Sequence, residues 1–227
     1  MKHPFISALK TSVLLLCLTW TCLADEGSTA SQPAPQSLFD GKTLTGWKET
    51  DFAGRGEVRI EDGLLILDSG LLTGVTWTND VPKIDYEINV DAMRVNGNDF
   101  FCGLTVPFHD SHFSLIIGGW GGGVTGISSI DGFDASENET TDYLRFVSDK
   151  WYHVRLRVTD HQIEAWLDEK KLVDFDTTER VIELRFGEIE LSAPLGFASY
   201  STKAALKNIT LTKLPPSEKT PKETEQN

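Results

Sequence analysis

The stretch WYHVRLRVTDHQIEAWLDEKKLVDF, residues 151–175, decides the fold. In its first part apolar side chains alternate with polar ones, and the apolar set is Tyr152, Val154, Leu156 and Val158. This period of two is typical of a strand with one buried face. After the turn-forming residues 160–162, the alternation resumes at Ile163, Ala165 and Leu167. The stretch therefore predicts two antiparallel strands joined in a hairpin.

Further strand patterns fill the chain on both sides of this hairpin. The longest lies at residues 83–92, where every second residue from Ile84 to Ala92 is apolar. Shorter candidates lie at residues 58–60, 64–67, 71–77, 100–106, 112–117, 143–147, 195–200 and 206–214. No long segment has helical periodicity with capping residues at its ends. Many short strands separated by turns predict an all-β fold, in which two antiparallel sheets form a jelly-roll sandwich.

The two ends of the chain differ in composition from the part between them. Residues 1–24 combine basic residues, an apolar run and small residues before Asp25, which predicts a secretory signal peptide. Residues 25–36 are polar and contain proline, which predicts a flexible linker, and residues 215–227 predict a disordered tail. Residues 37–214 then form one domain. We expect the protein to be exported to the periplasm or the extracellular space.

The net charge of the chain narrows the classes of partner that it can bind. The formal net charge is −13, and removal of Lys2 and Lys10 with the signal peptide makes it more negative by two. Such acidity argues against nucleic acids and anionic membranes as partners, and no later segment is long and apolar enough to span a membrane.

The cysteines predict a core without disulfides. Cys17 and Cys22 leave with the signal peptide, so Cys102 remains alone and no internal disulfide is expected. Its apolar neighbours predict a core position for Cys102.

Five short sequence segments, spread along the domain, together carry a resemblance to a known family. The domain opens with SLFDGKTLTGW at residues 37–47 and continues with EDGL at 61–64, DYEI at 85–88, the hairpin at 151–175 and LKNI at 206–209. Together they resemble the bacterial 3-keto-disaccharide hydrolase domain family over residues 37–214. The resemblance implies a concanavalin-like jelly roll that cleaves glycosides oxidised to a ketone at sugar carbon 3, as a lyase or a hydratase. Residues 114–141 depart from the family's usual pattern because they are unusually rich in glycine and aspartate.

Cleavage of such a glycoside needs a base, because the ketone makes the proton on carbon 2 acidic. The segment His109-Asp110-Ser111-His112 lies between two predicted strands, and the pKa of histidine lies near neutral pH. We therefore predict His109 or His112 as the catalytic base. Two alternatives stay open: the two histidines and the aspartate hold a divalent metal ion, or the segment is a solvated turn.

The glycine-rich run Gly118-Gly119-Trp120-Gly121-Gly122-Gly123 suggests a binding surface. Glycines on both sides remove neighbouring side chains, which leaves the Trp120 ring open as a platform for the apolar face of a sugar. The alternative is a bulged strand with Trp120 in the core.

The acidic loop, residues 131–141, supplies the remaining candidates. Glu137 or Glu139 is the predicted general acid, and Asp131, Asp134 and Asn138 are predicted to contact substrate. Asp99 at a loop end and Arg145 between two aromatic residues complete the predicted substrate contacts. The alternatives are a solvated acidic loop, a weak calcium site, a turn at Asp99 and a cross-strand ion pair at Arg145.

These observations lead to three hypotheses. The first is an exported enzyme that binds a carbohydrate and cleaves 3-keto-glycosides by proton abstraction and elimination or hydration, with a divalent metal ion as a possible cofactor. The second is a non-catalytic carbohydrate-binding module, and the third is a laminin-G-like module that binds protein. The first hypothesis expects that Asp99, His109, His112, Trp120 and Glu137 converge on one hollow.

Overall fold

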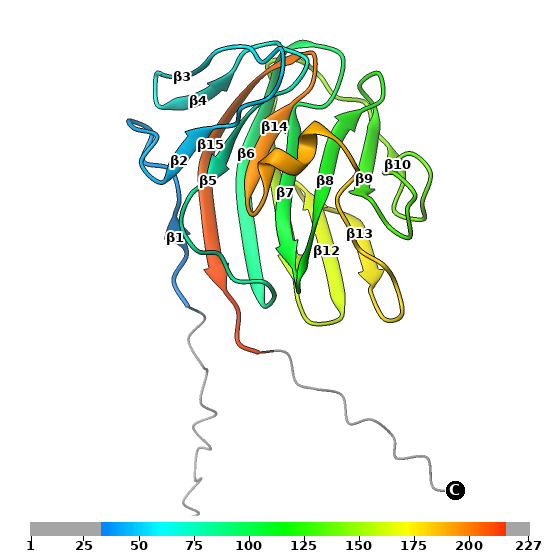
Figure 1. The fold of residues 1–227 in the computed structure, drawn as a ribbon. Helices are drawn as coiled ribbons and strands as arrows, with labels where there is room; N and C mark the ends of the chain where they lie inside the picture. Colours follow the sequence, from blue (N-terminus) through cyan, green and yellow to red (C-terminus); the bar gives the residue numbers. More distant parts are fainter. Residues whose placement is uncertain (1–32, 217–227) are drawn as a thin grey trace, which may run out of the picture. The chain divides into compact units, whose positions relative to one another are not determined.

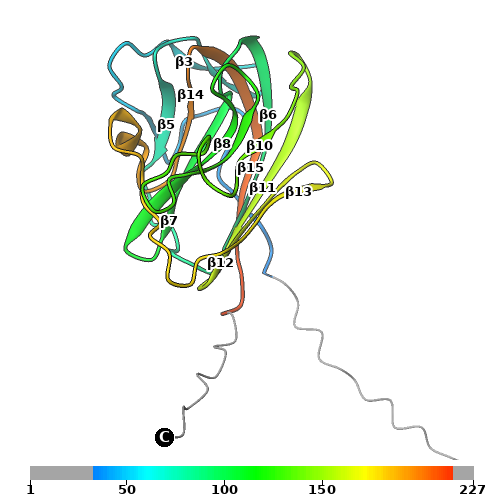
Figure 2. The same cartoon turned by 90° about the vertical axis from the view of Figure 1, so that its right-hand side faces the viewer.

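The computed structural model describes residues 33–216, which form two antiparallel sheets packed face to face (Figures 1 and 2). The eight-stranded sheet has the order β13 (Lys170–Asp176), β12 (Gln162–Leu167), β11 (Trp151–Val158), β6 (Tyr86–Gly97), β15 (Thr202–Lys213), β4 (Leu64–Leu67) and β3 (Val58–Glu61), with β1 (Gln36–Ser37) beside β15. The seven-stranded sheet has the order β10 (Asp142–Tyr143), β9 (Val124–Ser128), β8 (Ser111–Gly119), β7 (Cys102–Phe108), β14 (Gly196–Ser199), β5 (Thr73–Trp77) and β2 (Trp47–Glu49). The predicted two-sheet antiparallel sandwich is therefore confirmed.

The hairpin that decided the prediction is present. Strands β11 and β12 pair antiparallel, with Leu156 opposite Ala165 and Val158 opposite Ile163. Every second residue of β11 is buried, as the alternation of its sequence requires. These residues face the core between the two sheets, because burial of one apolar face drives each sheet against the other.

The core also contains the residues that fix the N-terminal part of the domain. The Trp47 ring lies 4.9 Å from the Trp77 ring in an edge-to-face arrangement, and the Trp47 indole N–H donates to the Leu38 carbonyl at 2.7 Å. Cys102 is completely buried in the same core. The predicted structural role of Cys102 is confirmed.

The structure differs from the predicted elements in the central and C-terminal parts of the domain. The predicted strand at 143–147 is only the two-residue strand β10, because Leu144 to Val147 leave the sheet. Strands β9 and β13 were missed, since β9 is buried on both faces and turn-forming residues directly precede β13. Strand β1 begins at Gln36, the last residue of the predicted linker.

Some predictions fall outside residues 33–216. The signal peptide at 1–24, the linker residues 25–32 and the tail residues 217–227 lie outside the described part of the chain. Within the described part, no helix is long and apolar enough to cross a membrane.

An irregular segment, residues 183–195, lies over the outer face of the seven-stranded sheet (Figures 1 and 2). We call it the strap. It contains a short 3₁₀ helix, η1 (Glu188–Ser192). Glu183 and Ser129 exchange backbone hydrogen bonds beside the end of β9, and Thr76 of β5 donates its hydroxyl to the Leu191 carbonyl at 3.0 Å. The strap therefore crosses from the β9 side of the sheet to β5.

Candidate functional site

The glycine-rich run forms a tight turn that presents Trp120 to solvent. This turn, residues 118–123, connects β8 to β9. Gly118, Gly121 and Gly122 have positive φ values of 79°, 86° and 106°, which glycine adopts without strain, and Trp120 itself has φ 47°. The Trp120 side chain is 41% exposed. The alternative that places Trp120 in the core is therefore wrong, and its open indole agrees with a platform.

Asp99 holds this turn on its outer side. Its carboxylate accepts a hydrogen bond from the Gly121 backbone N–H at 3.1 Å and another from the Phe100 N–H at 2.8 Å. The backbone N–H of Asp99 donates to the Thr202 hydroxyl at 3.0 Å. Asp99 thus shapes the loop next to Trp120, which adds a structural role to its predicted contact with substrate.

A groove runs along the outer face of the seven-stranded sheet beside Trp120. We call it the aromatic groove, and its walls are Phe100, Trp120, Arg185 and Tyr200. It continues beneath the strap over Leu72, Ser114, Ile116 and Ser128, where the cavity volume is about 210 Å³. The Phe100 and Tyr200 rings stack at 6.0 Å, and the Arg185 guanidinium lies 5.9 Å from the centre of the Trp120 ring. Aromatic rings next to a few polar groups are typical of carbohydrate and other ligand sites.

Arg185 is held in place from the acidic loop. Its Nε lies 3.0 Å from an Asp134 carboxylate oxygen, and the other Asp134 oxygen accepts a hydrogen bond from the Ser128 hydroxyl. Asp134 therefore links the guanidinium to the floor of the groove. The predicted substrate contact at Asp134 is in this way indirect, because Asp134 orients the arginine that faces the aromatic rings.

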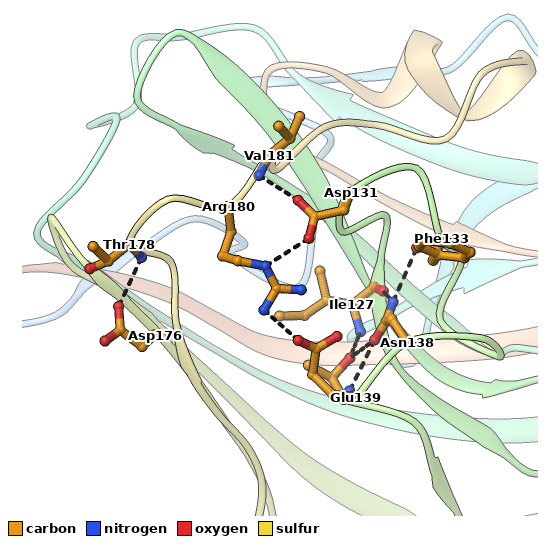
Figure 3. Close-up of polar contacts among 10 residues, drawn as sticks. Ile127, Asp131, Phe133, Asn138, Glu139, Asp176, Thr178, Arg180 and Val181 are labelled. Carbon is orange, nitrogen blue, oxygen red and sulfur yellow. Dashed lines mark hydrogen bonds and ion pairs between the residues drawn. The ribbon is translucent and has the colours of Figure 1, made fainter.

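The acidic loop divides into residues that face the groove and residues that do not. Asp134 and Glu137 line a pocket that adjoins the groove, together with Glu183, Arg185 and Phe186 of the strap. Figure 3 shows the other group: Arg180 binds Asp131 at 2.7 Å and also binds Glu139. Asp131 accepts a further hydrogen bond from the Val181 N–H at 2.8 Å.

This pairing changes the acidity of the two carboxyls. Hydrogen bonds from the Val181 N–H and Arg180 lower the pKa of Asp131, and the hydrogen bond from Arg180 lowers the pKa of Glu139. The pairing with Arg180 and the lowered pKa make Glu139 harder to protonate, whereas Glu137 lines the pocket that adjoins the groove. Of the two predicted general acids, the structure therefore favours Glu137 over Glu139.

Asn138 is committed to the shape of the loop. Its amide nitrogen shares its two hydrogens among the carbonyls of Ile127, Phe133 and Asp134, at 2.8, 3.1 and 2.9 Å. Figure 3 shows the contacts with Ile127 and Phe133. Its amide oxygen accepts from the Thr140 N–H at 3.0 Å. With both ends of the amide used internally, Asn138 stabilises the loop and is poorly placed to contact a substrate.

The two predicted catalytic histidines lie in a different pocket. His109 and His112 line it with Trp77, Lys83 and Pro194. Burial lowers the pKa of His112, and the nearby Lys83 ammonium lowers it further. The Nε2 atom of His109 lies 3.0 Å from the carbonyl oxygen of Asp160.

The strap explains why the predicted residues do not converge. His112 and Ser114 are two residues apart on β8 and therefore face the same side of the sheet. However, Pro194 of the strap lines the histidine pocket, whereas Glu188 and Ile189 line the aromatic groove. The expectation that Asp99, His109, His112, Trp120 and Glu137 share one hollow is therefore wrong. Asp99 and Trp120 meet in the groove, Glu137 adjoins it, and the histidines lie apart.

The structure gives no support for the metal alternative. Within residues 33–216, no group of three or more His, Cys, Asp or Glu side chains is arranged to hold a metal ion. Arg145, the last predicted substrate contact, is exposed beyond β10 and lines none of the pockets described above.

Several site residues were missed by the sequence analysis. Tyr200 lies at the end of a predicted strand between two serines, and an aromatic residue in such a polar, loop-adjacent position could have indicated a binding surface. Arg185 and Phe186 end the short alternation of apolar and charged residues at 182–186, which the sequence analysis overlooked and which does not by itself predict a position over the sheet. Arg94 follows the alternating run 84–92 at the next inward position, and a charged residue there was an overlooked signal.

Comparison with known proteins agrees with this architecture. One solved structure of similar fold is domain 4 of AbnA, a GH43 extracellular arabinanase from Geobacillus stearothermophilus, in complex with arabinotriose. Its sequence is 14% identical to this chain, and the two structures align with a TM-score of 0.52 over 82% of this chain and 94% of that chain. The Crh5 transglycosylase in complex with NAG is 11% identical, with a TM-score of 0.52 over 83% and 87%. The carbohydrate binding module CBM66 from Bacillus subtilis is 15% identical, with a TM-score of 0.47 over 74% and 95%. At these identities the first two likenesses show a shared fold.

Sequence comparison adds the family. No curated protein matches the chain. Residues 34–212, which include every strand except the final residue of β15, match the family model of the 3-keto-alpha-glucoside-1,2-lyase-like domain. The chain therefore belongs to the family of 3-keto-alpha-glucoside-1,2-lyase-like domains, a carbohydrate-active family.

Proposed function

We propose that the aromatic groove binds a carbohydrate. The observation that carries this proposal is the exposed Trp120 indole, held on a glycine turn beside Arg185 and Tyr200. The C–H face of a pyranose or furanose ring packs on an indole, while its hydroxyls need donors and acceptors at the edge. Arg185 supplies donors, and the Ser128 hydroxyl oxygen in the floor of the groove supplies an acceptor. Arabinotriose and NAG in the two structures of similar fold support sugars as the ligand class.

The binding test compares two tryptophans on opposite sheets. Trp120→Ala removes the platform, whereas Trp166→Ala removes a partly exposed indole that packs against Arg155 on the eight-stranded sheet. Calorimetric titration with arabinotriose, N-acetylglucosamine trimer, cellotriose and maltotriose identifies a ligand. We expect W120A to lose about tenfold or more in affinity, because stacking contributes about 1 kcal/mol beyond buried area. Equal affinities for W120A, W166A and the unchanged protein would show that sugars bind elsewhere.

The reaction that we propose for this site is elimination from a 3-keto-glycoside. A base takes the proton from carbon 2, and the electron pair forms a carbon 2–carbon 3 double bond, which turns the carbon 3 ketone into an enolate. The carbon 1–oxygen bond then breaks, the glycosidic oxygen takes a proton, and an enone remains, to which water can add. Family membership supports this reaction class.

Side chains of the groove fit these roles. Arg185 can stabilise the enolate oxygen, and of the two carboxyls that line the adjoining pocket Glu183 serves as the base and Glu137 as the acid. His109 and His112 remain candidate bases for a sugar bound in their own pocket. The alternative is a binding module that binds the sugar without turnover, and substitution of these side chains distinguishes it from an enzyme.

The reaction test uses 3-keto-glycosides and their unoxidised parents with the purified protein. We expect enone absorbance from the keto compounds alone. E137Q and E183Q should lower kcat by two orders of magnitude or more, while the neighbouring control E139Q should have little effect, because Arg180 already holds Glu139. Loss of turnover only in H109A or H112A would move the chemistry to the histidine pocket. Saturable binding without turnover would establish the binding module.

We also propose that the protein works outside the cytoplasm, on the basis of residues 1–24. Mass spectrometry of the protein from its native host should find a mature N-terminus near Asp25. An intact Met1 or a cytoplasmic location in fractionated cells would contradict export.

A further inference from the structure

Arg94 is a charged residue at a core position of the eight-stranded sheet. It is the next inward-facing residue after Ala92 in β6 and is only 6% exposed. Its guanidinium carbon lies 5.2 Å from the centre of the Phe101 ring and 5.7 Å from that of Phe146. Its Nε is buried without a hydrogen-bond partner among the described residues. Burial of an arginine with one nitrogen unpaired is costly, so a specific role must offset it.

The hydrogen bonds of Arg94 go to the turn that carries Trp120. Nη2 donates to the Gly122 carbonyl at 2.9 Å and is 3.2 Å from the Gly118 carbonyl. One nitrogen therefore joins the two ends of the turn from inside the sandwich. On the groove side, Asp99 binds the Gly121 N–H. The turn is thus held from both faces.

The glycines of the turn are fitted around this guanidinium. A Cβ on Gly118 would lie 2.6 Å from Arg94 Nη2, and a Cβ on Gly122 would lie 2.9 Å from the Asn98 carbonyl and 3.3 Å from Arg94 Nη1. Both residues also have positive φ. The glycines therefore serve two purposes: they adopt the positive φ values of the turn, and they leave the space that the Arg94 guanidinium occupies.

We propose that Arg94 is the positioning residue of the sugar platform. From the core it fixes both ends of the turn at residues 118–122, and this sets the Trp120 indole at the wall of the aromatic groove. Arg94 acts through Trp120, since its own guanidinium is buried away from the groove. The proposal rests on the proposed function only in naming the indole a sugar platform.

The first test needs no ligand. Hydrogen exchange followed by mass spectrometry compares the unchanged protein, Arg94→Met and the control Arg155→Met, whose guanidinium packs 3.8 Å from the Trp166 ring on the opposite face of the eight-stranded sheet. We expect the amides of Gly121, Gly122 and Gly123 to exchange about tenfold faster or more in R94M, with strands β7 and β8 unchanged. R155M should leave the turn unchanged. Turn amides that exchange in R94M as in the unchanged protein would overturn the proposal.

A second variant covers the case in which R94M does not fold. Arg94→Lys keeps the charge but loses the guanidinium fork, and a lysine ammonium cannot reproduce its planar geometry. We expect faster exchange confined to the turn in R94K as well. Exchange that increases over the whole eight-stranded sheet and spares the turn would overturn the proposal.

The last test asks whether Arg94 acts through Trp120. Affinities for the four trisaccharides named above are measured for R94M, W120A and the double variant. We expect R94M to bind at least about fivefold more weakly, and the double variant to bind no more weakly than W120A. Independent, multiplying losses would overturn the positioning role. If no trisaccharide binds the unchanged protein, the proposed function fails at that point, and the exchange experiment still decides the role of Arg94.

Discussion

The fold suppresses the reactivity of the Cys102 thiol. Burial raises the pKa of its thiol to about 12 from an ordinary 9.0, so almost no thiolate exists at neutral pH. In a chain that begins at Asp25, Cys102 is the single cysteine. We expect DTNB at about pH 8 to react with the folded protein about a thousandfold more slowly than with the protein in urea. Full labelling of the folded protein within minutes would contradict this.

Arg180 gives the stability of the domain a definite dependence on pH. Because Arg180 and the Val181 N–H lower the pKa of Asp131, and Arg180 lowers that of Glu139, both carboxyls bind protons less readily in the folded than in the unfolded state. Their contribution is present above the ordinary pKa values of 3.8 and 4.5 and is lost as pH falls through the lowered values.

The pH prediction is tested with Arg180→Met. Urea unfolding should show R180M less stable than the unchanged protein at about pH 7, and this difference should shrink towards about pH 3. Arg145→Met, at an exposed arginine near β10, serves as the control and should give a small difference that does not change with pH. A constant R180M difference from pH 7 to pH 3 would mean that Arg180 acts only by packing on Phe175.

At the scale of single residues, the sequence predicted the parts of the site that have a local cause. Trp120 was predictable because glycines on both sides leave it open whatever surrounds it. Arg185 was not, because its position depends on Asp134, a residue about fifty positions away in sequence, and on the path that the irregular strap takes over the sheet. The separation of His109 and His112 from the groove was unpredictable for the same reason, since residue type and loop position say nothing about which side of the strap they occupy.

The turn between β8 and β9 offers a matched pair of substitutions at the scale of the element. Gly121 and Gly122 both have positive φ, but a Cβ meets nothing within 4 Å at Gly121 and lies 2.9 Å from a carbonyl oxygen at Gly122. We expect Gly121→Ala to lower the free energy of unfolding by about 1 kcal/mol and Gly122→Ala by about 2–3 kcal/mol. Urea unfolding measures both. Equal losses would show that only the φ values matter.

Strands were predictable where one face meets the core and the other meets water. Strands β6, β11 and β12 show this alternation over their length and were identified from it. Strand β9 was not, because the acidic loop packs against its outer face at Gly126, which leaves both faces buried and removes the alternation. Coverage by irregular segments is a tertiary property that a local pattern does not contain.

At the scale of the whole molecule, β15 joins the first and last parts of the chain. It pairs with β6, β4 and β1 in the middle of the eight-stranded sheet. A chain that ends at Ser201 would leave β4 and β6 without their shared neighbour, so we expect it to lack cooperative unfolding. A chain that ends at Pro216 is the control. Calorimetry checks both, and a sharp transition in the shorter chain would contradict the central role of β15.

The strap lies on hydroxyl groups, and this has a consequence for its detachment. Thr105 and Ser114 are hydrogen-bonded at 2.8 Å on the outer face of the seven-stranded sheet, Ser128 pairs with Ser114 in register, and Thr76 binds the strap directly. If the strap lifted, water could hydrate this row of alcohols, but Leu72 and Ile116 beside the row would become exposed as well. A rebuilt strap therefore has to keep apolar cover over Leu72 and Ile116 and keep Leu195 in the core, whereas its exposed residues are free to change where new sugar specificity is wanted.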